Sequence, residues 1–243
     1  MTGLRPTPLR PATLRPATLR LTPAHVTRIH REVQDDGITP GFARHTDAEF
    51  ADWVARSLAA DPAPSGPLQL FVYGSLLWKP EVAHVTEAPA LLRGWHRAFC
   101  IRLPRFRGTE DFPGLMMALD RGGACRGLAL TLEPGDKAQQ LDKLFRRELP
   151  YNPTANLPRW VHVETATGPV TALTFVMNRA SPLYTGPLSP DVVADVLAQA
   201  CGYGGTGAEY LLNTVAHLES RGIRDSLLWQ LQDMVAARIE AHP

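Results

Sequence analysis

The segment best suited to chemistry is an apolar strand that stops abruptly at a glycine and a serine. Leu70 to Tyr73 forms the apolar run, and Gly74 and Ser75 follow it directly. Glycine has no Cβ, so the chain can turn sharply at this point. Such a turn can direct several backbone N–H groups into one concavity, where they bind a carboxylate or a developing oxyanion, and Ser75 adds a hydroxyl donor. The spacing alone also fits an ordinary corner at the end of a strand.

A glycine-rich segment near the C-terminus matches a nucleotide-binding motif only as a string. Gly202, Gly204 and Gly207 have the spacing G-x-G-x-x-G and precede an expected helix. That fingerprint requires a strand immediately before it. Asp191 to Ala200 instead has the apolar spacing of a helix. We therefore expect a glycine-rich turn between two helices, and an NAD-binding oxidoreductase is the weaker alternative.

The sequence contains no strong metal-binding or serine-hydrolase motif. Its eight histidines include no His-Glu-x-x-His pattern. His162 and Glu164, on an expected strand, would supply only two ligands. The residues around Ser75 do not form the G-x-S-x-G elbow of many hydrolases. No metal site is predicted, and a serine hydrolase has no positive support.

Charge and cysteine content limit the partners and the compartment. The chain has 25 Lys plus Arg against 24 Asp plus Glu, so its net charge of +1 creates no overall attraction to nucleic acid or an anionic membrane. Cys100, Cys125 and Cys201 form no C-x-x-C pair and suit a reducing compartment. No apolar run approaches the roughly 20 residues of a membrane span. Met1 to Arg20 also lacks the apolar stretch of a secretory signal. We expect a soluble, cytoplasmic protein.

The elements that position these segments follow an order typical of an α+β fold. Strands are expected first, a helix from about Asp136 to Leu149 interrupts them, and helices occupy the chain after Asn178. This order argues against a parallel, doubly wound sheet. The expected strands are Leu68 to Tyr73, Trp95 to Arg102, Leu115 to Leu119, Cys125 to Leu132, Trp160 to Glu164 and Val170 to Asn178.

The N-terminal quarter differs in composition from the rest of the chain. Its first residues carry repeated prolines and arginines without an acidic residue, a pattern that cannot propagate a helix. Thr22 can then cap one helix and Thr46 or Asp47 can start a second, and the Pro-rich stretch Asp61 to Pro67 ends this region. Three parts are predicted: a disordered Arg/Pro-rich tail (1–22), a helical extension with its linker (23–67) and the main domain (68–243).

Four blocks of the sequence resemble the ChaC family of γ-glutamylcyclotransferases. The blocks are Phe71 to Pro80 (FVYGSLLWKP), Gly94 to Cys100 with Arg107-Gly108-Thr109 and Pro113-Gly114, Arg146 to Glu148, and Gly205 to Leu211 (GTGAEYL). They stand in the family's order between residues 68 and 240. Ordered blocks of this kind are more specific than any single motif. Residues 1–60 lie outside the resemblance.

The resemblance implies a compact α+β fold, built on a mixed sheet that closes towards a barrel and is flanked by helices. It also implies a lyase that converts glutathione to 5-oxoproline and cysteinylglycine without a cofactor. In that reaction the α-amine of the γ-glutamyl group attacks its own γ-carbonyl and closes a five-membered lactam. We expect a monomer. The alternatives are a cyclotransferase for other γ-glutamyl amines or peptides and a non-catalytic carboxylate-binding protein.

The resemblance also implies roles for individual residues. Glu148 falls on the family's catalytic glutamate, and a carboxylate whose pKa is raised by burial could take the ammonium proton and pass it to the leaving amine. Its charged helix alone would predict a solvated side chain. Arg107 could pair with a substrate carboxylate, and Tyr210 could contact the substrate or simply pack in the core. The sequence departs from the family's pattern after Glu148, and the loop there, from Leu149 to Pro158, could shape the leaving-group pocket. The γ-glutamyl end is expected to bind at Val72, Tyr73, Gly74, Ser75 and Leu76.

Overall fold

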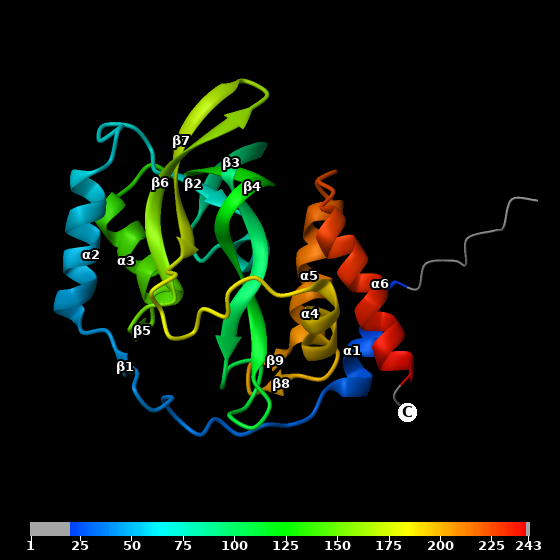
Figure 1. Cartoon of the computed structure of the whole chain (residues 1–243). Coiled ribbons are helices and arrows are strands. Elements are labelled where there is room, and N and C mark those ends of the chain that lie inside the picture. Colours follow the sequence, from blue (N-terminus) through cyan, green and yellow to red (C-terminus); the bar gives the residue numbers. More distant parts are fainter. Residues whose placement is uncertain (1–19, 242–243) are drawn as a thin grey trace, which may run out of the picture.

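Five strands form a closed barrel at the centre of the molecule (Figure 1). The computed structural model describes residues 20–241, so residues 1–19, with most of the predicted tail, and residues 242–243 lie outside the described residues. The barrel strands are β2 (Gln69–Val72), β3 (His84–Leu103), β4 (Gly114–Leu132), β6 (Asn156–Thr165) and β7 (Gly168–Met177). They hydrogen-bond in the order β2-β4-β3-β6-β7, and a parallel pairing of β2 with β7 closes the barrel. The predicted α+β fold with a barrel is confirmed.

β3 and β4 form one long antiparallel hairpin, which differs from the predicted strands. The sequence predicts two strands on either side of Gly122-Gly123, whereas β4 is continuous through them. β3 likewise begins at His84, well before the predicted start at Trp95. The two glycines have φ angles of 103° and 66°, and the register of β3 against β4 shifts opposite them. A bulge of this kind bends a strand without ending it.

Two groups of helices lie on opposite sides of the barrel (Figure 1). On one side α2 (Asp47–Ala59) packs against α3 (Lys137–Glu148), and on the other lie α1 (Pro23–Ile29), α4 (Pro190–Leu197), α5 (Gly207–Glu219) and α6 (Ser226–Ala241). Their apolar faces share one core with barrel residues such as Leu70 and Phe175. The predicted helix near 136–149 is confirmed. Thr22 caps α1 as predicted, and of the two predicted starts of α2, Thr46 is the N-cap. Within residues 20–241, no helix combines the length and the apolar character needed to cross a membrane.

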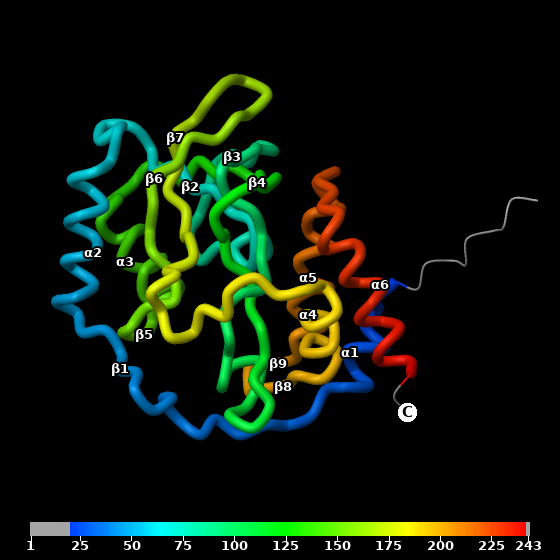
Figure 2. The backbone as a smooth tube through the Cα atoms, in the orientation of Figure 1, coloured from blue at the N-terminus to red at the C-terminus, as the bar shows by residue number. Residues whose placement is uncertain are grey.

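The chain between α1 and α2 crosses the molecule along the lower edge of the barrel (Figure 2). We call residues 30–46 the N-terminal strap. The strap includes β1 (Ala43–Arg44), which pairs with β5 (Tyr151–Asn152) just after α3. Ahead of α1, Leu21 is buried in the apolar core. The strap therefore joins the two helical groups and touches the segment that follows α3.

The glycine-rich segment after α4 is a tight hairpin, so the C-terminal part is not wholly helical as predicted. β8 (Cys201–Gly202) pairs with β9 (Gly205–Thr206). The preceding element is the helix α4, as expected, and not the strand that a nucleotide motif needs. A Cβ at Gly202 would collide with the Arg105 carbonyl, and one at Gly204 with the Phe106 ring. The glycines therefore let this hairpin pack closely against the β3–β4 connection.

Candidate active site

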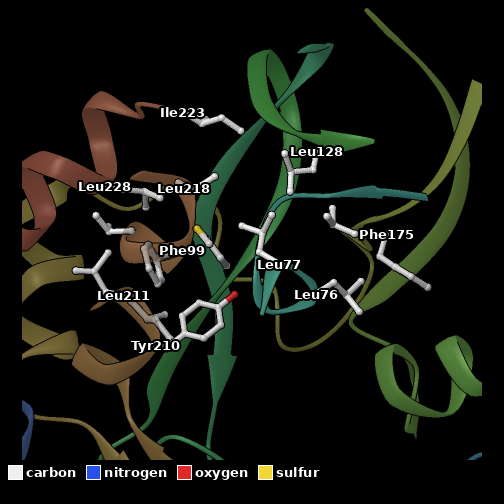
Figure 3. Close-up of a cluster of buried hydrophobic side chains, with 14 of the residues drawn as sticks. Leu76, Leu77, Phe99, Leu128, Phe175, Tyr210, Leu211, Leu218, Ile223 and Leu228 are labelled. Carbon is white, nitrogen blue, oxygen red and sulfur yellow. The ribbon is translucent and has the colours of Figure 1, made fainter. Parts of the chain in front are cut away.

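The predicted cradle forms at a short 3-10 helix directly after β2. Gly74 precedes this helix, η1 (Ser75–Leu77). The first N–H groups of such a helix, at Ser75 and Leu76, have no acceptor inside it. Within residues 20–241 they donate to no other backbone or capping group. The side chains of Val72 and Leu76 lie in the apolar core, and Figure 3 shows Leu76 there. At these two positions only the main chain is therefore available to a ligand.

Tyr210 on α5 lies directly against this turn. A Cβ at Gly74 would stand only 3.1 Å from the Tyr210 hydroxyl oxygen, so glycine allows the close approach. Edge contacts with Trp78 and Phe99, at ring-centroid distances of 5.7 and 6.2 Å, fix the Tyr210 ring. The ring is buried, and its hydroxyl points towards η1 (Figure 3). The phenol therefore forms one wall of the site.

Glu148 is the last residue of α3, and its side chain is only 16% exposed. Burial raises the pKa of this carboxyl above its ordinary value of 4.5, the Arg147 guanidinium opposes that rise, and the charge of Glu81 adds to it. Arg147 Nε lies 3.1 Å from Glu148 Oε1, and a terminal nitrogen of Arg147 donates to the Ser75 hydroxyl over 3.2 Å. Arg147 thus links the largely buried Glu148 carboxylate to the turn.

The charge of Glu148 acts on two tyrosines of the site. Burial is the main cause that raises the pKa of Tyr73 and that of Tyr210, and the Glu148 carboxylate is the second cause for each. Because Coulomb interactions weaken with distance, this coupling places the carboxylate near both rings. The Tyr73 hydroxyl donates to the Phe175 carbonyl over 2.9 Å. Tyr73 is therefore tied into the barrel, and Tyr210 is the phenol that faces the turn.

Arg107, in the β3–β4 connection, lies over the face of Tyr210. Its guanidinium carbon is 5.5 Å from the Tyr210 ring centroid. One terminal nitrogen donates to the Glu209 carboxylate over 2.9 Å and to the Thr206 carbonyl over 2.7 Å. Its Nε is buried and has no hydrogen-bond partner in the described part of the chain. Glu209 therefore holds Arg107 beside the site and partly balances its charge.

Arg97 on β3 holds the main chain of the turn. Its side chain is 1% exposed. Nε donates to the Tyr73 carbonyl over 2.8 Å, one terminal nitrogen to the Asp225 carboxylate over 2.8 Å, and the other to the Arg126 carbonyl. In a trans peptide the C=O and the next N–H point in opposite directions. By binding the Tyr73 carbonyl, Arg97 directs the Gly74 N–H to the opposite side of the peptide.

The structure brings most of the predicted site residues together. Glu148, the turn at Gly74-Ser75, Tyr210 and Arg107 occupy one region, whereas the side chains of Val72 and Leu76 point into the core. Among residues 20–241, no group of three or more His, Cys, Asp or Glu side chains is arranged to bind a metal ion.

Two arginines of this region, Arg97 and Arg147, are missing from the predictions made from the sequence. Both stand in segments that resemble the family, next to other quoted residues. That placement is the only signal that marks them. Residue type does not, because arginine is mostly found at the protein surface.

The curated relatives that this chain resembles include several named as γ-glutamylcyclotransferases. The family model described as ChaC-like protein matches residues 68–238. A relative from Escherichia coli (strain K12), named glutathione-specific gamma-glutamylcyclotransferase, is 37% identical over 173 residues, which cover 71% of this chain and 74% of the relative. Glutathione-specific gamma-glutamylcyclotransferase 1 of Mus musculus is 31% identical over 159 residues, 64% of this chain and 71% of the relative. A crystal structure of a glutathione-specific cyclotransferase from yeast shares the fold, with a TM-score of 0.65 and 18% identity over 73% of this chain and 99% of the other. The chain belongs to the ChaC family.

Proposed function

We propose that this chain is a glutathione-specific γ-glutamylcyclotransferase, a lyase that forms 5-oxoproline and cysteinylglycine from glutathione. The observation that carries the proposal is the largely buried carboxylate of Glu148, joined through Arg147 to the turn at Gly74-Ser75. A base beside free N–H donors suits a reaction that removes a proton and develops an oxyanion. The bacterial and mouse relatives named for glutathione support the same substrate.

The proposed reaction is an acyl transfer within the substrate. The α-amine nitrogen attacks the γ-carbonyl carbon, the new C–N bond closes a five-membered lactam, and the amide bond to cysteinylglycine breaks. Glu148 accepts the proton that the α-ammonium loses and returns it to the departing amine. The enzyme ends unchanged, and no water is consumed. Holding the substrate in a near-attack conformation can contribute roughly 7 to 11 kcal/mol.

The turn and its neighbours hold the substrate in this proposal. The N–H groups around Gly74, Ser75 and Leu76 stabilise the oxyanion at the γ-carbonyl, and one such donor is worth roughly 2.7 to 4 kcal/mol. Arg107 pairs with a carboxylate of the substrate, because its buried Nε is a donor that the described part of the chain does not use. Tyr210 closes the site on the side of α5.

A cytoplasmic location is part of the same proposal. Cys100, Cys125 and Cys201 are all free thiols in the structure. Free thiols persist in compartments that glutathione keeps reducing. Such a compartment also supplies the proposed substrate.

Product analysis with the purified full-length chain tests the proposal directly. We expect cysteinylglycine and 5-oxoproline to appear from glutathione without added metal or nucleotide, and we expect a panel of γ-glutamyl dipeptides to react far more slowly. Chromatography of the products measures both rates. Turnover of the dipeptides but not of glutathione would contradict the substrate assignment. Tight retention of a carboxylate ligand without turnover of any γ-glutamyl compound would favour a binding protein instead.

The activity should follow the ionisation of Glu148. Only the carboxylate can accept a proton, and burial raises the pKa of Glu148 above 4.5. As the pH is lowered, kcat/KM on glutathione should therefore fall around a pKa higher than that ordinary value. The same pKa shift makes the folded protein less stable where Glu148 is ionised, because the folded state favours the protonated form. The contribution of Glu148 to the free energy of unfolding is unfavourable above the raised pKa and improves as the pH falls through it.

A pH–rate profile from about pH 4 to pH 8, with thermal melting over the same range, measures both effects. The profile should be recorded at constant ionic strength, so that screening of the Arg147 charge does not change between points. A profile that falls around an ordinary carboxyl pKa would contradict the proposed burial of the base.

A further inference from the structure

The N-terminal strap and the start of α2 contact the chain on both sides of Glu148. The strap, residues 30–46, lies outside the part of the sequence that the family model matches, residues 68–238. After Glu148, the strap strand β1 pairs with β5. Before it, Arg146 lies 2.8 Å from the carboxylate of Asp47, where α2 begins. The residue proposed as the base is therefore bracketed by contacts from a distant segment.

Of the strap residues, His45 contacts the two residues that directly follow Glu148 in the sequence. Its Nδ1 lies 2.8 Å from the Leu149 carbonyl oxygen, and its backbone N–H donates to the Pro150 carbonyl over 3.4 Å. A carbonyl oxygen only accepts, so Nδ1 must carry a proton. The His45 ring also packs against Phe50, with centroids 5.5 Å apart, and Phe50 belongs to the buried core. The imidazole is thus anchored on one side and donates on the other.

The acceptor of this bond is the end of the helix that carries Glu148. Leu149 is buried and is the C-cap residue of α3. Carbonyls at a helix C-terminus lack donor partners within the helix, and a side-chain donor that binds one of them stabilises the last turn. Glu148 belongs to that turn. Any fraying there moves its carboxylate relative to Ser75 and Tyr210.

Arg105 connects the earlier part of the strap, at Asp35, to the same segment, at Tyr151. Arg105 donates to the Tyr151 hydroxyl over 2.7 Å and also pairs with Asp35 in the strap. The guanidinium of Arg44 lies over the Tyr151 ring, 5.6 Å from its centroid. Strap residues consequently hold the segment that follows Glu148 at positions 149–152.

We propose that His45 is a positioning residue for the cyclotransferase reaction, because through the Leu149 carbonyl it fixes the helix end that carries Glu148. This role rests on the proposed function of Glu148. It also means that the N-terminal extension contributes to the geometry of the active site. His45 itself touches neither the substrate nor the transferred proton.

Steady-state kinetics of the full-length chain test this role. His45→Leu should lower kcat on glutathione roughly 10- to 100-fold, the loss expected from a small misplacement of a catalytic group, while KM changes little. His45→Asn should restore most of kcat, because the asparagine amide nitrogen can replace Nδ1 as the donor. His96→Leu is the matched control: His96 Nδ1 also bonds a carbonyl, that of Gly122, over 3.1 Å, but on the β3–β4 hairpin. It should keep the kcat of the unchanged chain.

Thermal melting of each variant separates positioning from loss of fold. Wild-type kcat in His45→Leu, an equal loss in His45→Leu and His45→Asn, or a loss that matches the unfolded fraction at the assay temperature would overturn the role. If the unchanged chain does not convert glutathione at all, the proposed function fails, and the role that rests on it fails as well.

Discussion

Replacing Glu148 by glutamine should reduce kcat on glutathione roughly 10²- to 10⁴-fold, the range typical for loss of a general base. Glutamine keeps the volume of the side chain and an oxygen that can accept from Arg147 Nε, which lies 3.1 Å from Glu148 Oε1. It cannot accept the ammonium proton. Because the N–H groups at Ser75 and Leu76 are unchanged, KM should change little. Steady-state kinetics with detection of cysteinylglycine measures both constants.

The Glu148→Gln variant should remain folded. Burial raises the pKa of Glu148, so the ionised carboxylate destabilises the folded state at neutral pH, and a neutral amide removes that penalty. Arg147 keeps a second acidic partner in Glu81, at 3.0 Å. The melting temperature should therefore equal or exceed that of the unchanged chain.

Glu164→Gln is the control for this substitution. Glu164 is exposed on β6 and pairs with Arg93 over 2.7 Å at the barrel surface, far from the proposed chemistry. Its replacement should leave kcat unchanged. Near-normal turnover in Glu148→Gln would remove Glu148 from the mechanism and would return the carboxylate-binding alternative to consideration.

Local signals explain why most elements could be predicted from the sequence. The capping box of Thr46 with Glu49 marks the start of α2 within the sequence itself, and Pro150 stops α3 where the prediction ends it. The long hairpin could not be predicted in the same way. Gly122-Gly123 is compatible with a turn and with a bulge, and only the pairing of β4 with β3 decides between them.

The site depends on contacts between residues that are distant in the sequence. Local sequence patterns therefore do not predict it, and its residues could be predicted only from the family resemblance. Glu148 stands in a charged helix, and its burial comes from elements that are remote in the sequence. Arg97 depends on distant residues even more clearly than Glu148 does. Its partners Tyr73, Arg126 and Asp225 are 24, 29 and 128 residues away. No local pattern distinguishes such an arginine from one at the surface.

Arg97→Met should be the most destabilising substitution in the site. Methionine fills much of the same space but leaves two carbonyls without a donor and the Asp225 carboxylate without its cation. Breaking a buried ion pair from one side costs roughly 3 kcal/mol or more. For a chain of this size, that cost lowers the melting temperature by roughly 6 to 12 °C. In protein kept folded at low temperature, KM for glutathione should also rise, because the Tyr73-Gly74 peptide loses its anchor.

The matched control for this change is Arg93→Met on the same strand. Arg93 and its partner Glu164 are 68% and 56% exposed, and solvent screens exposed pairs so strongly that they add little to stability. The control should therefore melt close to the unchanged chain, well above Arg97→Met. An Arg97→Met variant that melts equally close to it would show that the buried pair does not stabilise the fold.

The double variant Arg97→Met with Asp225→Asn separates the two roles of Arg97. It leaves no unpaired charge, so it should regain much of the lost melting temperature. Asparagine can still accept the hydrogen bond that the Asp225 carboxylate receives from the Leu228 N–H over 3.2 Å at the start of α6. The Tyr73 carbonyl, however, still lacks a donor, so KM should stay raised. If KM recovers together with the melting temperature, Arg97 acts through overall stability alone and does not orient the turn. If only the melting temperature recovers, the carbonyl bond is what prepares the turn for substrate.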